Sequence, residues 1–107
     1  MQSPLGEFEV MVLLAVLHLA DAAYPPSVRS EIERRARRKV ARGAIYVTLD
    51  RLESKGLLSS ASADEHTPGA RPRRTYRATQ RGLRALRRAM AAVERMKAGL
   101  EPVLNQS

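Results

Sequence analysis

The side chains best suited to chemistry in this sequence are arginines, and the chemistry they offer is the binding of anions. Sixteen of the 19 Lys and Arg residues are Arg, and with only 11 Asp and Glu the formal net charge is +8. A guanidinium group is planar and donates parallel hydrogen bonds that match a phosphate group or the edge of a guanine base. The composition therefore favours a polyanionic partner, above all a nucleic acid. The alternative is a basic surface that is merely solvated.

Residues able to support catalysis or metal binding are few and poorly spaced. Cysteine is absent, which excludes disulfides, thiolate metal sites and cysteine nucleophiles. His18, Asp21 and Ser27 match no nucleophile motif, and the adjacent acids and histidine of residues 64–66 rarely close a metal site from a single loop. We interpret His18 as a histidine of the core or of an interface. No enzymatic activity, cofactor or metal is expected.

The stretch from Val40 to Leu58 is predicted to contain a short helix whose two faces have different roles. Ile45, Leu49 and Leu52 recur at i, i+4 and i+7 and form an apolar stripe that must be buried. The opposite face can approach a large partner closely because it is small or polar; it carries Ala44, Val47, Asp50, Arg51 and Ser54. A basic last turn followed by a glycine suited to a left-handed conformation predicts where the helix ends.

Two helices are predicted before this element. Residues 5–19 form an apolar helix that cannot hide every side against its own small core, so part of it should meet a second subunit. The only long apolar run, residues 8–20, is shorter than the roughly 18 residues of a membrane span, which favours a soluble, cytoplasmic protein. A second helix is predicted to begin at Pro26 or Ser27 and to end in the basic run of residues 34–39. Two short helices joined by a turn are typical of a helix-turn-helix.

Residues after Gly56 change from helical to extended periodicity. Residues 57–63 and 73–78 predict the two strands of a hairpin, and the tip between them contains two prolines and a glycine. The tip and the second strand carry four arginines: Arg71, Arg73, Arg74 and Arg77. The hairpin is therefore predicted to be a charged ribbon beside the preceding helix, with a solvated loop of scattered arginines as the alternative.

Thr79 is a good N-cap for a long terminal helix that reaches about Leu100. Spacings of three and four predict one apolar seam, interrupted at Lys97, which comprises Leu83, Leu86, Met90, Val93 and Leu100. Because nothing after this helix is suited to cover the seam, we expect it to pair with a helix of a partner subunit.

Three segments, in the same order, resemble PadR-like winged-helix transcription regulators. Residues 43–57, GAIYVTLDRLESKGL, are similar to the family's recognition helix, residues 69–82 to its wing strand and the turn into its last helix, and residues 6–14 to its first helix. The resemblance implies a mostly α fold with a small two-stranded β wing. A winged helix-turn-helix DNA-binding part would occupy residues 1–78 and a C-terminal dimerisation helix residues 79–107, together forming one compact unit.

The resemblance further implies a homodimer that regulates transcription, most often by repression, at a two-fold symmetric operator in double-stranded DNA. Some members of the family bind a small aromatic or drug-like effector near the dimer interface. Thr75 departs from the pattern, since the wing often has a second tyrosine there, and the single terminal helix looks like the short branch of the family without a separate effector domain. The predicted interface comprises Phe8, Met11, Val12, Leu83, Leu86, Met90, Val93 and Leu100.

In such a complex the recognition helix would enter a major groove of the DNA. Arg51 would fork onto a guanine, while Val47 and Ala44 would touch thymine methyl groups. Thr48 and Tyr46 would donate hydroxyls to phosphates, although Tyr46 could equally be a packing residue. Basic residues before this helix and on the wing would bind phosphates or an adjacent minor groove: Arg38, Lys39, Arg42, Arg71, Arg73 and Arg74. The main alternative is a winged-helix module that binds protein or structured RNA, and a membrane-surface role is less favoured because the terminal helix lacks Trp and Phe.

Overall fold

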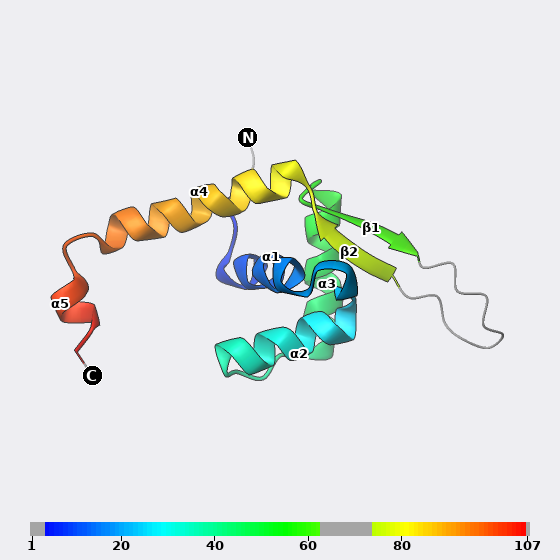
Figure 1. Ribbon diagram of the computed structural model, residues 1–107, viewed down its shortest axis with the longest axis horizontal. Coiled ribbons are helices and arrows are strands. Elements are labelled where there is room, and N and C mark those ends of the chain that lie inside the picture. The colour runs from blue at the N-terminus through cyan, green and yellow to red at the C-terminus, as the bar shows by residue number, and fades with distance from the viewer. Residues whose placement is uncertain (1–3, 63–73, 107) are drawn as a thin grey trace.

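The computed structural model describes residues 4–62 and 74–106. Three helices form a body from which a two-stranded ribbon projects on one side and a long helix on the other (Figure 1). The elements follow in the order α1 (Glu7–Leu19), a 3-10 turn (Ala20–Ala22), α2 (Pro25–Ala36), α3 (Arg42–Ser54), β1 (Leu58–Ser62), β2 (Arg74–Ala78), α4 (Gln80–Lys97) and α5 (Glu101–Leu104). The strands pair antiparallel, with Leu58 opposite Ala78. The predicted fold, mostly helical with a two-stranded wing, is confirmed.

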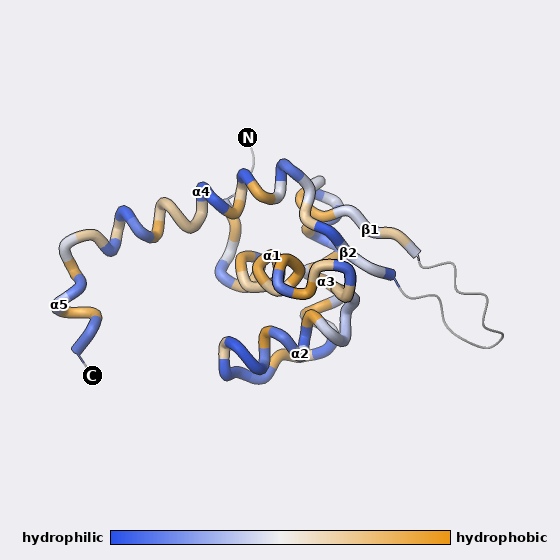
Figure 2. The backbone as a smooth tube through the Cα atoms, viewed as in Figure 1, coloured by the Kyte–Doolittle hydropathy of each residue, from blue (hydrophilic) through white to orange (hydrophobic). Residues whose placement is uncertain are grey.

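The core of the body lies between α1, α2 and α3, where apolar side chains of all three helices meet. The predicted stripe of Ile45, Leu49 and Leu52 on α3 is buried. Figure 2 shows that α1 is hydrophobic along most of its length, whereas α2 and α4 alternate between hydrophobic and hydrophilic residues. Burying one such aliphatic side chain contributes roughly 1.5–3 kcal/mol relative to leaving it exposed. This burial fixes which face of α3 remains for solvent.

The end of α3 follows the prediction made from its glycine. Gly56 has a φ of +77°, in the left-handed region that glycine adopts without steric cost. Its N–H donates to the carbonyl of Glu53, and the N–H of Leu57 donates to the carbonyl of Leu52, both at 2.9 Å. These two bonds form a Schellman cap that satisfies the last carbonyls of α3 and turns the chain into β1.

The beginning of α2 differs from both of the predicted starts. The helix begins at Pro25, not at Pro26 or Ser27, because the hydroxyl of Ser27 acts from inside the first turn. It accepts a hydrogen bond of 3.0 Å from the N–H of Tyr24, the residue before the helix. The serine therefore caps the helix backwards, as the side chain at the third position of a capping box does.

The terminal segment is a long helix followed by a short one, so the prediction of a single terminal helix is wrong. The predicted cap at Thr79 is confirmed, because its hydroxyl accepts from the N–H of Gly82 at 3.0 Å. The helix ends at Lys97, before the predicted Leu100, and Gly99 follows with a φ of +87°. This left-handed residue turns the chain into α5, which has a proline in its first turn. None of the helices within the described ranges is long and apolar enough to cross a membrane.

Candidate nucleic-acid interface

The exposed face of α3 is the surface that the three-helix body leaves uncovered on its third helix. Its exposed residues are Arg42, Gly43, Tyr46, Val47, Asp50, Arg51 and Ser54, and Ala44 is half-buried. Val47 is 56 % exposed although it lies in the middle of the helix. Because its side chain is exposed, Val47 contributes little to the core. The small residues of this face, such as Gly43 and Ser54, let a partner approach the backbone of α3 closely. The guanidinium of Arg42 lies 6.0 Å from the centre of the Tyr46 ring, which is a cation–π contact.

Thr48 does not belong to this face, and its predicted role as a phosphate contact is wrong. It is only 5 % exposed. It follows Ile45 by three residues and precedes Leu52 by four, so it lies within the buried stripe of α3. The sequence prediction had placed it beside the exposed face, with its hydroxyl free to donate to a phosphate.

Two side chains of α2 hold the residue that leads into α3. Arg29 donates from Nε to the carbonyl of Val40 at 2.8 Å, and Glu33 accepts from the N–H of Val40 at 2.9 Å. Arg29 and Glu33 are one helical turn apart and lie 3.9 Å from each other. Both backbone groups of a buried residue are thereby satisfied, so the start of α3 is fixed to α2. Sequence reasoning missed this pair, although its i, i+4 spacing was a signal.

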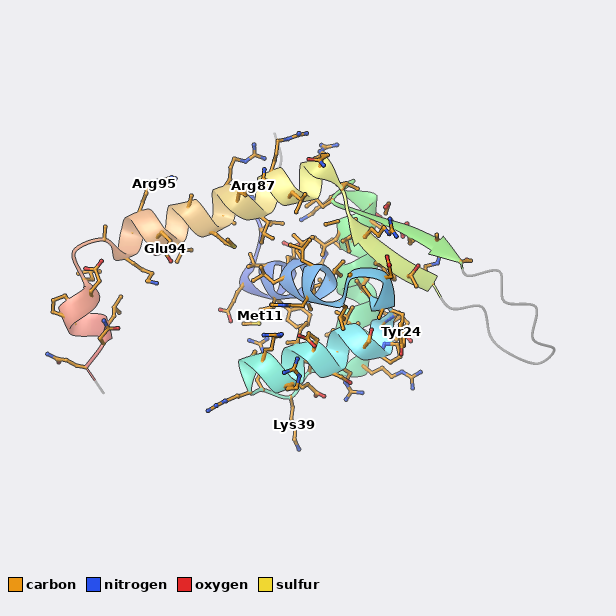
Figure 3. The ribbon with its side chains drawn as sticks, viewed as in Figure 1. Met11, Tyr24, Lys39, Arg87, Glu94 and Arg95 are labelled. Carbon is orange, nitrogen blue, oxygen red and sulfur yellow. The ribbon has the colours of Figure 1, made fainter. Side chains whose placement is uncertain are left out.

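The two basic residues predicted on the loop between α2 and α3 have different surroundings. Arg38 lies 3.2 Å from the carboxylate of Glu7, and its guanidinium stands 5.5 Å from the centre of the Phe8 ring. It is therefore held against the beginning of α1. Lys39 is exposed and points away from the body (Figure 3). Lys39 is thus the freer of these two cations.

The wing contacts α3 through polar side chains of both of its strands. Arg74 lies 3.2 Å from the hydroxyl of Ser60 across the hairpin and 3.8 Å from the carboxylate of Glu53 on α3, which Ser60 also contacts. These partly exposed contacts contribute little to stability but orient the arginine along the ribbon. Arg71 and Arg73, which we also predicted to bind DNA, lie outside the described residues.

The second strand also packs on the body. The N–H of Tyr76 donates to the carbonyl of Ala23 at 2.8 Å, and Arg77 pairs with Asp21 at 2.7 Å. Burial, together with the carboxylates of Asp50 and Glu53, raises the pKa of the Tyr76 hydroxyl. The tyrosine therefore stays neutral and anchors the wing beside α3.

A partly buried ion pair ties the beginning of α1 to the end of α3. The carboxylate of Glu9 lies 2.9 Å from the ammonium of Lys55 and accepts a 2.9 Å hydrogen bond from the N–H of Gly6. Burial alone would raise the pKa of Glu9, but the Gly6 N–H, Lys55 and the nearby Arg51 outweigh it and lower this pKa. Sequence reasoning missed this pair, because its two residues lie 46 positions apart in the chain.

The predicted dimer interface divides into buried and uncovered residues. Val12 and Leu86 are buried in the core of this chain, so their assignment to a partner surface is wrong. Phe8, Met11 and Leu83 are half-buried, while Met90, Val93 and Leu100 are exposed. Further along the chain, Met96 on α4 and Val103 and Leu104 on α5 are exposed as well. His18 is exposed, which excludes the core for it.

A groove lies between the beginning of α1 and the middle of α4. It has a volume of about 960 Å³ and is lined mainly by apolar side chains: Leu5, Val10, Leu57, Ala89, Met90 and Val93. Glu94 stands at its rim, whereas Arg87 and Arg95 leave α4 on the side away from α1 (Figure 3). The side of α4 that lines the groove is thus mainly apolar, although Arg88 also lines it, whereas Arg87 and Arg95 lie on the other side of the helix (Figure 3).

The arrangement of the described helices and strands is that of a known class of DNA-binding fold. A three-helix body with a helix-turn-helix, an uncovered third helix and a two-stranded ribbon beside it make up a winged helix-turn-helix protein. Residues 13–88 match the model of the family described as "Transcriptional regulator PadR-like family". The chain belongs to this family, as the resemblance of its three segments predicted.

Solved structures of PadR regulators have the same fold. A PadR family transcriptional regulator from Eggerthella lenta is 28% identical, with a TM-score of 0.71 over 94% of this chain and 88% of that one. A PadR family transcription regulator from Clostridium difficile is 22% identical, with a TM-score of 0.73 over 92% of this chain and 99% of that one. No curated protein matches the chain.

Proposed function

We propose that the protein is a sequence-specific DNA-binding regulator that acts as a homodimer, as a repressor, on a two-fold symmetric operator. The observation that carries this proposal is the uncovered face of α3, where Arg51 and Val47 are exposed on a chain of net charge +8. A major groove accommodates one α-helix, and a guanine edge is the commonest target of an arginine fork. Membership of a family of transcriptional regulators supports the same reading.

Within this proposal the contacts divide into base contacts and phosphate contacts. Arg51 reads a guanine, and Val47 and Ala44 pack on thymine methyl groups. Arg42, Lys39 and the wing arginines bind phosphates, which add affinity without sequence information. The exposed hydroxyl of Tyr46 extends this set at the side of α3.

The dimer is proposed from the apolar side of α4. Met90 and Val93 are 43 % and 57 % exposed, and Met96 is 78 % exposed. Monomeric soluble proteins rarely leave a contiguous apolar patch of this kind in water. A second copy related by a two-fold axis would cover it by placing its α4 against α1 and α4 of the first copy. Residues 79–107 then serve as the dimerisation segment, and an apolar effector would bind at the dimer interface, where the groove between α1 and α4 meets the second copy.

The DNA contacts are tested with three single substitutions that remove the same charge. Selection from a random pool of duplexes first gives the operator, and binding is then titrated at two salt concentrations. Arg51→Ala is expected to weaken operator binding by roughly 5- to 150-fold and to relax the preference at one base pair. Lys39→Ala should leave preference intact and lower the slope of log K against log salt by about 0.9. Arg95→Ala, on the far side of α4, is the control and should change neither. Equal losses for all three variants on all duplexes would contradict these assignments, and a preference for structured RNA over duplex DNA would contradict the function.

The dimer is tested by light scattering after size-exclusion chromatography. Met90→Lys combined with Val93→Lys is expected to give a monomer, because it places two ammonium groups in the apolar surface. Ala91→Lys, an exposed position on the opposite side of the same helix, is the matched control and should remain dimeric. A wild type that is monomeric at micromolar concentration would refute the proposed assembly.

Repression is tested in a reporter strain. Loss of the protein is expected to raise expression from a promoter that contains the operator.

A further inference from the structure

Asp50 is the acid on α3 that the fold leaves without a partner. It is exposed on the proposed DNA-facing side, one turn after Val47 and one turn before Ser54. In the described part of the body and wing, each other carboxylate has a cationic partner within 4.0 Å: Glu7, Glu9, Asp21, Glu31, Glu33 and Glu53. Asp50 has neither an ion pair nor a hydrogen bond among the described residues.

The presence of an aspartate at position 50 is not explained by a contribution to the stability of α3. Asp is a weak helix former in a helix interior, and acids favour the first turn of a helix rather than its second half. No cation stands three or four residues away on α3, since these positions hold Tyr46, Val47, Glu53 and Ser54. Arg51 is adjacent in sequence and therefore points about 100° further round the helix. The carboxylate is thus neither neutralised by its own helix nor useful to it.

An unpaired carboxylate on this face also opposes binding to phosphates. Whenever α3 approaches a duplex, this carboxylate comes close to a polyanion. The carboxylate therefore weakens binding to all sequences alike. That penalty is offset where the carboxylate meets a hydrogen-bond donor. In the major groove the donors are the exocyclic amino groups of cytosine and adenine. Adenine presents its N7 acceptor beside the amino group, which repels a carboxylate, whereas cytosine presents no acceptor next to its amino group.

We propose that Asp50 is a specificity-determining residue that accepts a hydrogen bond from the amino group of a cytosine in the major groove. It selects a C·G pair at one operator position and weakens binding to sequences that lack it. Two of its neighbours on the exposed face, Val47 and Ser54, are small and leave room for its short side chain to reach a base edge, while the larger Tyr46 lies one turn before it. The inference rests on the proposed function and adds a second base-reading residue beside Arg51.

The test compares Asp50→Asn with a control that removes the same charge elsewhere. Asn keeps the size of the side chain but can donate and accept, the pattern that pairs with adenine. Glu101→Gln changes the net charge equally at an exposed acid on α5, without an ion pair among the described residues. Wild type and both variants are each selected against a pool of random duplexes, and affinities are measured for the selected duplex, for single-base-pair variants of it and for an unrelated duplex.

For Asp50→Asn we expect one position of the selected motif to change from cytosine to adenine or to lose its preference. At that position the wild type should prefer C·G by roughly 5- to 150-fold and the variant by less than about 2-fold. Binding of the variant to the unrelated duplex should tighten, and Glu101→Gln should keep the wild-type motif. Asp50→Ala should lose the cytosine preference without gaining one for adenine.

Two results would overturn the inference. An Asp50→Asn motif identical to that of the wild type leaves the proposed function standing and removes Asp50 from base reading. A wild type without any sequence preference refutes the proposed function and this inference together. Unchanged thermal unfolding of Asp50→Asn serves as the check that the altered preference does not come from a damaged fold.

Discussion

Gly82 offers a sharp test of how α4 is attached to the rest of the protein. A Cβ atom added at this position would lie 2.1 Å from the carbonyl oxygen of Leu57, which is backbone and cannot rotate away. Ordinary contact begins near 3.4 Å, so the beginning of α4 must retreat by more than 1 Å to accept an alanine. The substitution Gly82→Ala is therefore expected to separate α4 from the end of α3.

The magnitude follows from the contacts that hold this junction. Overpacking costs about 1–3 kcal/mol. The retreat also weakens two hydrogen bonds of Thr79, one from its N–H to Leu57 at 3.1 Å and one from its hydroxyl to Gly56 at 2.7 Å, each contributing about 1 kcal/mol. The better helix propensity of alanine returns about 1 kcal/mol. We expect a net loss of about 3 kcal/mol in the free energy of unfolding, or a drop in Tm of about 10 °C or more.

The assay is chemical and thermal denaturation followed by circular dichroism, at one protein concentration. Gly43→Ala is the matched control, because Gly43 also lies in the first turn of a helix but has nothing within 4 Å of its would-be Cβ. It should be neutral or more stable by up to about 1 kcal/mol. A Gly82→Ala protein as stable as wild type, or equal destabilisation by both substitutions, would refute the reasoning.

Three further substitutions follow from hydrogen bonds described above. Glu9→Gln keeps an acceptor for Gly6 but removes the ion pair with Lys55, and should cost about 1–2 kcal/mol at pH 7 in urea denaturation. Because the folded-state pKa of Glu9 is lowered, its contribution is complete above the unfolded value of about 4.3 and disappears as pH falls through the folded value, so wild type and variant should converge in acid. A constant difference down to pH 2 would be inconsistent with this. Glu33→Ala leaves the N–H of Val40 without its acceptor and should cost about 1–3 kcal/mol, with loss of operator preference if the start of α3 moves; an unchanged Tm would exclude this role. Thr79→Val removes the cap of α4 and should cost about 1–2 kcal/mol in the same assay, whereas Thr79→Ser should restore most of it.

The features that local sequence could predict are those decided by neighbours along the chain. The stripe of Ile45, Leu49 and Leu52 was predicted correctly because helical spacing alone places these residues on one side. The glycine cap at Gly56 was predictable for the same reason, since only the preceding turn decides whether a left-handed residue is needed. The wing strands were predicted to within one residue at each end.

The features that sequence could not decide depend on distant residues. Periodicity shows that Val12 and Leu86 are covered, but not whether the cover is their own core or a partner, and here it is their own core. The pairs that fix the site join residues 46 and 31 positions apart, as Lys55 does with Glu9 and Arg38 with Glu7. The same limit applies to Asp50, which is distinguished by having no ion pair among the described residues. Its lack of a partner becomes visible only when the partners of the other acids are known.

The junction at Thr79 has a mechanical consequence for a regulator of this kind. Gly56 and Leu57 form the short piece of backbone between α3 and the wing, and their carbonyls accept hydrogen bonds from Thr79. The start of α4 lies so close to this backbone that a Cβ at Gly82 would come within 2.1 Å of the Leu57 carbonyl oxygen. In the proposed dimer built on α4, this rigid junction would make α3 move together with α4. A tilt of one protomer against the other would therefore change the position of α3. If the proposed dimer forms, the spacing and inclination of its two α3 helices would be set at the subunit contact, so the length of the operator would be specified far from the bases that it contains.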